Sequence, residues 1–169
     1  MNRKLTTLAL GMAAVLAAVP AFAQETKPVG LSVRLGIFLP SDSGTQSAVG
    51  KTWFGGGVEY KIQNLNFGTM NKGYTSALSI SLDYYSKSSV SIMPITVNYV
   101  GSMNEFFYTA GAGIAMLKDG STENRFCYVL GLGYNFTKGP QPIFLEARYL
   151  GVPSATGAQG FGIFVGTRF

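Results

Sequence analysis

Apolar residues alternate with small or polar residues along almost the whole chain after residue 30. In the clearest run, RFCYVLGLGYNF (125–136), every even-numbered residue from Phe126 to Phe136 is large and apolar. A repeat of two residues is the period of a β-strand, whose side chains point alternately to opposite faces. The same repeat occurs in seven further runs, at 31–40, 52–62, 74–85, 91–100, 105–116, 143–150 and 161–169. The chain is therefore predicted to be all-β.

The segments between these runs carry residues that favour turns. Examples are SKSS (86–89), KDGSTEN (118–124) and TKGPQP (137–142), which combine glycine, proline, asparagine and serine. No long linker or change of composition divides residues 24–169. One domain of antiparallel hairpins is therefore predicted.

The two faces of the predicted strands differ in an unusual way. One is uniformly apolar, whereas the other mixes single charges with large rings and with glycine pairs such as Gly111/Gly113 and Gly131/Gly133. In a soluble sandwich or lipocalin, the apolar face would line the core and a hydrophilic face would meet water. Glycine weakens a water-exposed strand but makes room for large neighbours inside a narrow barrel. The pattern thus favours a barrel with its apolar face outward.

An outward apolar face indicates a membrane environment. Strands of about ten residues can span a bilayer when tilted, and closure into a barrel satisfies the backbone hydrogen bonds. Tyrosines near the ends of the runs fit an interfacial aromatic girdle: Tyr60, Tyr84, Tyr99, Tyr108 and Tyr149. The predicted fold is an eight-stranded antiparallel up-and-down transmembrane β-barrel. A periplasmic lipid-binding barrel is the alternative.

The N-terminal residues have the pattern of a secretory signal peptide. Two basic residues precede an apolar stretch, and AFA (21–23) forms a small-residue cleavage motif. We expect cleavage between Ala23 and Gln24, which divides the chain into a signal peptide (1–23) and a barrel domain (24–169). The alternative, a membrane-spanning helix, is disfavoured because the apolar stretch is short and rich in alanine.

Composition limits the possible partners and chemistry. Charged residues make up only 12% of the chain, and the scattered basic residues leave no footprint of a nucleic-acid partner. Cys127 is the only cysteine, so an internal disulfide is excluded, and we expect it to be a small lumen residue. Because histidine is absent, a hydroxyl nucleophile would lack its usual base and a His/Cys metal site is excluded. We expect neither enzymatic activity nor a cofactor.

Three stretches, FGIFVGTRF (161–169), FLEARY (144–149) and GAGIA (111–115), together with the signal peptide, resemble the small outer-membrane β-barrel family with its OmpA-, OmpX- and OmpW-like members. In that family, a last strand ending in an aromatic residue is the recognition signal for the outer-membrane assembly machinery. The resemblance gives this role to Phe161, Ile163, Val165 and Phe169. Thr167 departs from the family pattern, in which a larger residue is commoner.

The resemblance implies an integral protein in the outer membrane of a Gram-negative (diderm) bacterium. The implied partners are outer-membrane lipid, lipopolysaccharide and the barrel assembly machinery, and a monomer is expected. Family members include envelope anchors, adhesins, small pores and lipid-modifying enzymes, so the fold leaves the function open. We expect a structural, envelope or surface-interaction role with a largely plugged lumen. The alternatives are a small pore, a barrel that transports or binds apolar solutes, and a soluble periplasmic lipocalin-like binder.

Charges on the inward face are expected to form a network that plugs the lumen: Arg34, Glu59, Asp83, Arg125, Glu146, Arg148 and Arg168. Charges inside a narrow barrel must pair with one another, because an unpaired buried charge has a large desolvation cost. The alternative is that these charges line a selective ion path. We expect Glu146 to bridge at least one of Arg34, Arg148 and Arg168. Asp83 and Arg125 are expected nearer the external mouth.

The order of the runs also predicts a topology. If the domain begins and ends on the periplasmic side, the external connections are 40–51, 86–89, 118–124 and 151–159. The periplasmic turns are then 63–73, 101–104 and 137–141.

Overall fold

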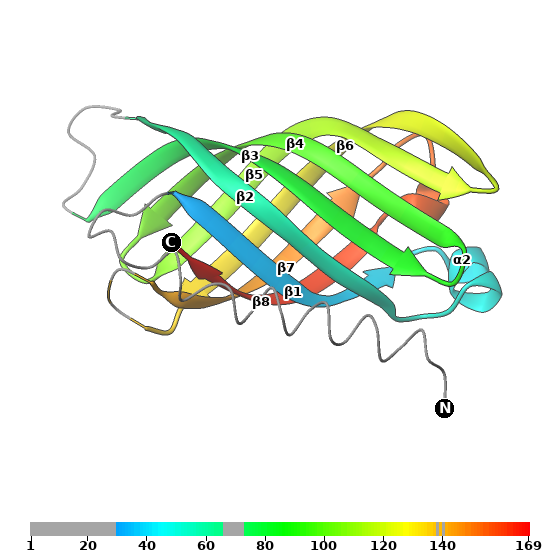
Figure 1. Ribbon diagram of the computed structural model, residues 1–169, viewed down its shortest axis with the longest axis horizontal. Coiled ribbons are helices and arrows are strands. Elements are labelled where there is room, and N and C mark those ends of the chain that lie inside the picture. Colours follow the sequence, from blue (N-terminus) through cyan, green and yellow to red (C-terminus); the bar gives the residue numbers. More distant parts are fainter. Residues whose placement is uncertain (1–29, 66–72, 138, 140) are drawn as a thin grey trace.

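The computed structural model describes residues 30–65, 73–137, 139 and 141–169, which form a closed antiparallel β-barrel (Figure 1). The elements in chain order are β1 (Leu31–Pro40), α2 (Ser43–Ala48), β2 (Trp53–Leu65), β3 (Tyr74–Lys87), β4 (Val90–Met103), β5 (Phe106–Asp119), β6 (Ser121–Asn135), β7 (Ile143–Gly151), η2 (Thr156–Ala158) and β8 (Gly160–Arg168). The predicted eight-stranded antiparallel barrel is confirmed. The expected cleavage site at Ala23 and Gln24 lies outside the described residues. Within the described part of the chain, no helix is both long and apolar enough to cross a membrane.

The barrel closes where β8 pairs with β1. Ser32 lies opposite Arg168, and Pro40 lies opposite Gly160 at the other end of the pair. The ladder continues to the last residue, because the backbone N–H of Phe169 donates to the Leu31 carbonyl at 2.7 Å. The terminal strand is therefore held by its neighbour along its whole length.

The barrel has two ends of different construction, which Figure 1 shows on opposite sides. The α2 end holds α2, η2 and the hairpins β3–β4 and β5–β6. The C-terminal end holds Phe169 and the β4–β5 hairpin. The described connections therefore fall at two ends in the grouping that the sequence predicted, whereas residues 66–72 of the expected turn 63–73, and 138 and 140 of the turn 137–141, lie outside the described residues.

Two details of the α2 end differ from the sequence prediction. The segment 40–51 contains the short helix α2, whose N-cap Asp42 accepts a hydrogen bond from the Thr45 backbone N–H at 2.7 Å. The expected loop at 118–124 is wrong, because β5 and β6 continue until only Gly120 separates them. Gly120 has a φ of 73°, a left-handed conformation that glycine adopts without steric cost and that permits this tight turn.

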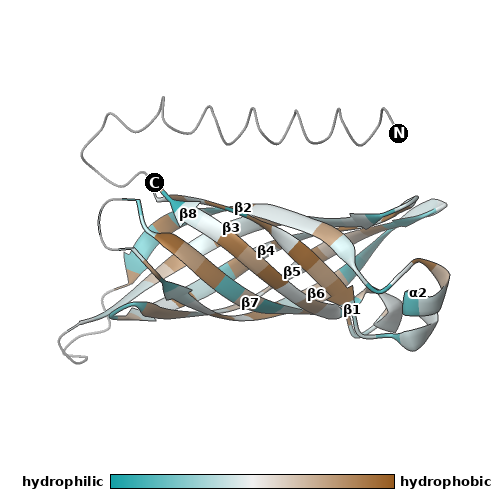
Figure 2. Ribbon diagram, turned by 90° about the horizontal axis from the view of Figure 1, so that it is seen from below, coloured by the Kyte–Doolittle hydropathy of each residue, from teal (hydrophilic) through white to brown (hydrophobic). Residues whose placement is uncertain are grey.

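The outer face of the barrel carries the apolar residues of the alternating pattern. Leu132 is 70% exposed and Val97 is 48% exposed, and most other residues of this face are similarly open. Figure 2 shows hydrophobic residues distributed along the strands of the wall. The outward direction of the apolar face is therefore as the sequence predicted.

Aromatic residues cluster on the outer face towards both ends of the barrel. Near the C-terminal end, Tyr134 contacts Phe106 and Phe136, with ring centroids 4.9 and 5.2 Å apart. Towards the α2 end, Tyr149 packs 4.8 Å from Phe161 and 6.0 Å from Tyr128. This distribution has the geometry expected of two aromatic girdles.

Inward glycines give space to large side chains. A Cβ atom on Gly133 would lie 2.1 Å from the Phe107 ring, and one on Gly111 would lie 2.0 Å from Asn98 Oδ1. Both distances are far below van der Waals contact, so a larger residue would displace these neighbours. The expectation that the glycine pairs make room inside the barrel is confirmed at these positions.

Candidate functional site: the barrel lumen

The centre of the lumen is closed by ion pairs around Arg34. Its Nε and Nη2 donate to Asp83 Oδ1 at 2.9 and 2.6 Å, and its Nη1 donates to Glu59 Oε2 at 2.9 Å. Arg34 and Asp83 are 1% and 0% exposed. Both charges are removed from water, so the folded barrel is stable only while Arg34 and Asp83 remain paired with each other.

The register of three strands explains how Arg34 reaches Asp83. Arg34 on β1 lies opposite Gly57 on β2, and Gly57 lies opposite Asp83 on β3. A Cβ atom on Gly57 would lie 1.9 Å from Asp83 Oδ1. The missing side chain of Gly57 therefore provides the space in which the ion pair forms.

Arg148 and Glu146 complete the central cluster from β7. Arg148 Nη1 lies 3.7 Å from Asp83 Oδ2 and 3.8 Å from both Glu59 Oε2 and Glu146 Oε1. Glu146 Oε2 lies 3.9 Å from Arg34 Nη1. The structure thus brings Glu146 beside Arg34 and Arg148, at ion-pair distance but beyond hydrogen-bond distance.

A polar triad lies beside these charges. Asn98 Nδ2 donates to Ser81 Oγ at 3.0 Å, Thr96 Oγ1 donates to Asn98 Oδ1 at 2.8 Å, and the two hydroxyls are 2.8 Å apart. Arg148 Nη2 also contacts Ser81 Oγ at 3.4 Å. Ser81, Thr96 and Asn98 are not among the site residues predicted from the sequence, although their inward positions in the alternating pattern are a signal that identifies them.

Two expected members of the network, Arg125 and Arg168, lie outside the central cluster. Arg125 is near the β5–β6 hairpin, where its half-exposed guanidinium pairs with Glu123 at 2.6 Å outside the central cluster. Asp83 was expected nearer the external mouth than Arg34; the register through Gly57 brings it into the central cluster, where it accepts hydrogen bonds from Arg34. Among the described residues, Arg168 forms no ion pair with Glu146, and its Nη1 donates to Asn135 Oδ1 at 3.0 Å.

The half of the lumen towards the α2 end is filled by apolar side chains. Phe38 stacks on Tyr85 with centroids 4.6 Å apart and meets the edge of Trp53 at 5.9 Å. Phe164 packs 6.0 Å from Tyr85. Cys127 is fully buried in the same cluster, at the inward position that the sequence predicted. The described residues form no ion pair inside this half of the lumen, which is closed by the packing of these apolar side chains.

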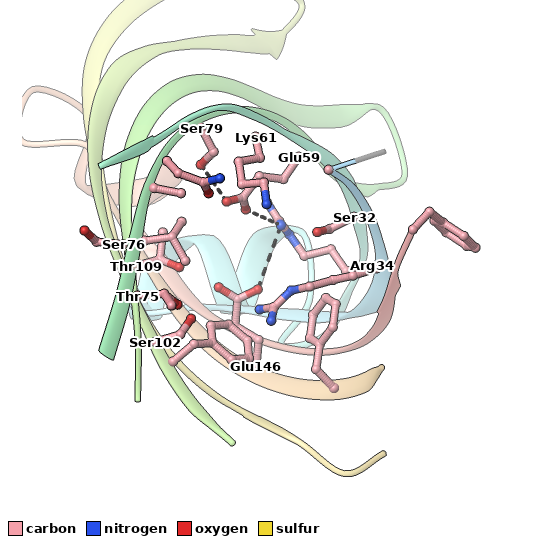
Figure 3. Close-up of a pocket in the computed structure, with 18 residues that line it drawn as sticks. Ser32, Arg34, Glu59, Lys61, Thr75, Ser76, Ser79, Ser102, Thr109 and Glu146 are labelled. Carbon is pink, nitrogen blue, oxygen red and sulfur yellow. Dashed lines mark hydrogen bonds and ion pairs between the residues drawn. The ribbon is translucent and has the colours of Figure 1, made fainter. Parts of the chain in front are cut away.

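The half towards the C-terminal end contains a cavity of about 240 Å³ (Figure 3). Arg34, Glu59 and Glu146 line it from the central cluster, and Lys61 and Arg168 line it further along their strands. The Arg168 guanidinium lies over two rings, 4.2 Å from the Phe107 centroid and 5.0 Å from the Phe144 centroid. Hydroxyl groups supply much of the remaining wall: Ser32, Thr75, Ser76, Ser79, Ser102 and Thr109. The cavity is thus a chamber that combines charged and hydroxyl groups with the rings of Phe107, Phe144 and Phe169, and it ends at the central ion pairs.

The residues of the expected assembly signal lie on β8 and at the end of the chain. Phe161, Ile163 and Val165 point outward and are 57%, 47% and 56% exposed. Phe169 is half-buried beside the start of β1 and lines the mouth of the cavity. Recognition of this segment by the assembly machinery stays a prediction.

Comparisons with known proteins do not extend the assignment. No family model matches the chain, and no curated protein matches it either. Among the described residues, no group of three or more histidine, cysteine, aspartate or glutamate side chains could hold a metal ion. The function must therefore be inferred from the geometry of the barrel.

Proposed function

We propose that this chain is an integral outer-membrane β-barrel protein of a diderm bacterium with a structural, envelope or surface-interaction role and a plugged lumen. The observation that supports the proposal is that the closed barrel wall is apolar on its outer face and carries charges on its inner face. Large apolar side chains such as Leu132 and Phe106 are more than half exposed outside, whereas Arg34, Asp83 and Arg148 are buried inside. A soluble lipocalin-like binder would require the opposite arrangement.

A lipid environment would remove the free-energy cost of exposing the apolar outer face to water. Full exposure of a large apolar side chain to water costs roughly 1.5–3 kcal/mol of burial free energy, and the more open outward side chains are 36% to 70% exposed, so each would lose part of that amount in water. Hydrocarbon removes that cost and requires closure, because unpaired backbone groups are costly in lipid. The strands contain 9 to 15 residues, enough to cross the apolar core of a bilayer when tilted. The aromatic clusters at both ends would then lie at the two interfaces.

The filled lumen favours an interaction or envelope role over a pore. The central ion pairs and the rings of Phe38, Trp53 and Tyr85 close the barrel at two successive levels. The small pore remains the second candidate function, because the half of the lumen towards the C-terminal end contains a cavity through which a solute could pass as far as the central cluster. Transport or binding of apolar solutes is a further alternative, which the charged and hydroxyl groups of that chamber disfavour and its phenylalanine rings favour.

The proposed partners follow from the membrane assignment. Outer-membrane lipid and lipopolysaccharide would cover the apolar wall, and the assembly machinery would insert the barrel as a monomer. The absence of histidine from the chain supports a protein without catalytic activity.

Cell fractionation tests the location, and planar bilayers test the plug. Expressed with residues 1–23 in a diderm host, the protein should remain in the outer-membrane fraction after alkaline extraction. A protein recovered from the soluble periplasm would contradict the membrane proposal. Purified protein whose insertion is verified should show no stable conductance. A stable single-channel conductance would favour the pore.

A further inference from the structure

The chamber at the C-terminal end is lined by a buried acid, Glu146, that accepts no hydrogen bond at Oε1 among the described residues. Glu146 is 1% exposed. The nearest cationic nitrogens lie 3.8 and 3.9 Å from its two oxygens, on Arg148 and Arg34. Figure 3 shows the Glu146 carboxylate at the wall of the chamber, facing Arg34. An ionised carboxylate in such a place favours an additional N–H donor.

Two cations, Arg168 and Lys61, line the same chamber, and neither has a carboxylate partner within the part of the chain that the structure describes. Arg168 donates to the neutral Asn135 amide and stacks on Phe107 and Phe144. Lys61 lies beside Gly30 at the end of the barrel, and its backbone N–H donates to the Gly30 carbonyl at 2.8 Å. Neither side chain has a carboxylate oxygen within 4.0 Å among residues 30–65, 73–137, 139 and 141–169.

The strand positions separate the buried acid from the two cations. Glu146 lies opposite Phe164 on β8, and Arg168 follows four residues later on that strand. Lys61 follows Glu59 by two residues on β2 and points to the same face. Among the described residues, the inner wall of the chamber therefore carries a carboxylate that is ion-paired but whose Oε1 accepts no hydrogen bond, and the part towards the mouth carries two cations without a carboxylate within 4.0 Å.

We propose that this chamber binds a small zwitterion, with its ammonium group at Glu146 and its acid group towards Lys61 and Arg168. A volume of about 240 Å³ is below the usual range for drug-sized ligands and suits a short amino acid. The hydroxyls of Ser102 and Thr109 in the wall supply further hydrogen-bond partners. The proposal does not depend on the membrane assignment, because the folded barrel presents the same chamber in detergent.

Calorimetric titration of the folded full-length barrel in detergent micelles tests the site. The probe is 4-aminobutyrate, with N-acetyl-4-aminobutyrate and butylamine as controls that lack the ammonium or the acid. We expect saturable binding of 4-aminobutyrate and at least tenfold weaker binding of each control, because each lacks one charge-assisted contact. Glycine and 6-aminohexanoate then measure the separation of the two charges. No binding of any zwitterion, or equal binding of the controls, would overturn the proposal.

Matched variants locate the binding to the chamber. Glu146→Gln should weaken 4-aminobutyrate binding at least tenfold, whereas Glu123→Gln at the α2 end should leave it unchanged. Lys61→Met should weaken binding several-fold, whereas Lys118→Met should not. Because Glu146→Gln also alters the central cluster, Ser102→Phe provides a second variant that fills the chamber and leaves the charges intact. Unchanged affinity in Lys61→Met and Ser102→Phe would overturn the assignment.

Discussion

The outer face and the lumen of this barrel are built from alternate residues of the same strands, yet different forces stabilise them. On β4, Val97 is 48% exposed on the outside, whereas its neighbours Thr96 and Asn98 are each 1% exposed inside. The outer residues form few contacts with the rest of the chain and depend on the surrounding solvent. The inner residues depend on specific partners, such as Ser81 for Asn98.

Each face therefore tolerates a different kind of substitution. Apolar groups outside are interchangeable in hydrocarbon, because lipid adapts to their shape, but a charge there is costly. Charges inside are tolerated because they are paired, and removal of one partner leaves the other without compensation. Substitutions on the two faces should therefore have effects of different size and different dependence on the solvent.

The largest expected effect is in the central cluster. Asp83→Asn removes the carboxylate that accepts two hydrogen bonds from Arg34 and leaves that guanidinium under-compensated. We expect a loss of about 3–5 kcal/mol in the free energy of unfolding, measured by urea denaturation in vesicles. Asp119→Asn, in the exposed β5–β6 hairpin, is the matched control and should change little. Equal effects of the two substitutions would show that the cluster does not stabilise the lumen.

A charge in the middle of the outer face should have a smaller effect that depends on the solvent. Val97→Arg is expected to cost about 2–4 kcal/mol in lipid vesicles, as for a cation near the bilayer midplane. The same variant in detergent should lose less, because the arginine can reach water around a micelle. Equilibrium folding in both media measures the difference. A variant as stable as the unmodified protein in vesicles would refute contact of this face with hydrocarbon.

Deletion of one methyl group in the apolar half of the lumen should have a modest effect. Ile92 is 2% exposed among the rings at the α2 end. Ile92→Val should cost about 0.5–1.5 kcal/mol, because the cavity left behind is small. The cost should be equal in vesicles and in detergent, unlike that of Val97→Arg. Chemical denaturation in both media makes the comparison, and a strong dependence on the medium would contradict the assignment of Ile92 to the interior.

The smallest effect is expected at α2, outside the wall. The Thr45 backbone N–H and hydroxyl hydrogen-bond to Asp42 and lower the pKa of its carboxyl. A lowered folded-state pKa contributes stability above the ordinary value of about 4, and this contribution is lost as the pH falls through the lowered pKa. Asp42→Asn should therefore abolish a low-pH shift of the Thr45 amide NMR signal and leave the global unfolding midpoint unchanged. A retained shift would assign it to another group.

The alternating pattern was sufficient to predict the barrel wall. Period-two repeats identified the eight strands and the outward direction of residues such as Leu132 and Val97. The helix α2 was missed because six residues with a single capping interaction leave no apolar periodicity. The tight turn at Gly120 was missed because polar residues at 121–124 continue a strand that extends beyond the apolar band.

The lumen was only partly predictable, because its contacts depend on register. The inward charges were found from the pattern, and Glu146 lies beside Arg34 and Arg148. The pairing of Arg34 with Asp83 depends on a glycine lying between them in the sheet, which a single run of sequence does not show. The stacking of Arg168 on Phe107 likewise depends on how the last strand meets the middle of the barrel.

The most direct test of the account measures which solvent each side of the wall contacts. Single cysteines at Ile80, Val97 and Ser47, introduced in a Cys127→Ala background, would carry spin labels in protein reconstituted into lipid vesicles. Collision rates with oxygen, which partitions into lipid, and with a nickel chelate, which stays in water, report the environment of each label. The account predicts high oxygen and low nickel accessibility at Ile80 and Val97, with the reverse at Ser47 in α2. Nickel accessibility at Ile80 and Val97 equal to that at Ser47 would contradict an apolar wall facing lipid.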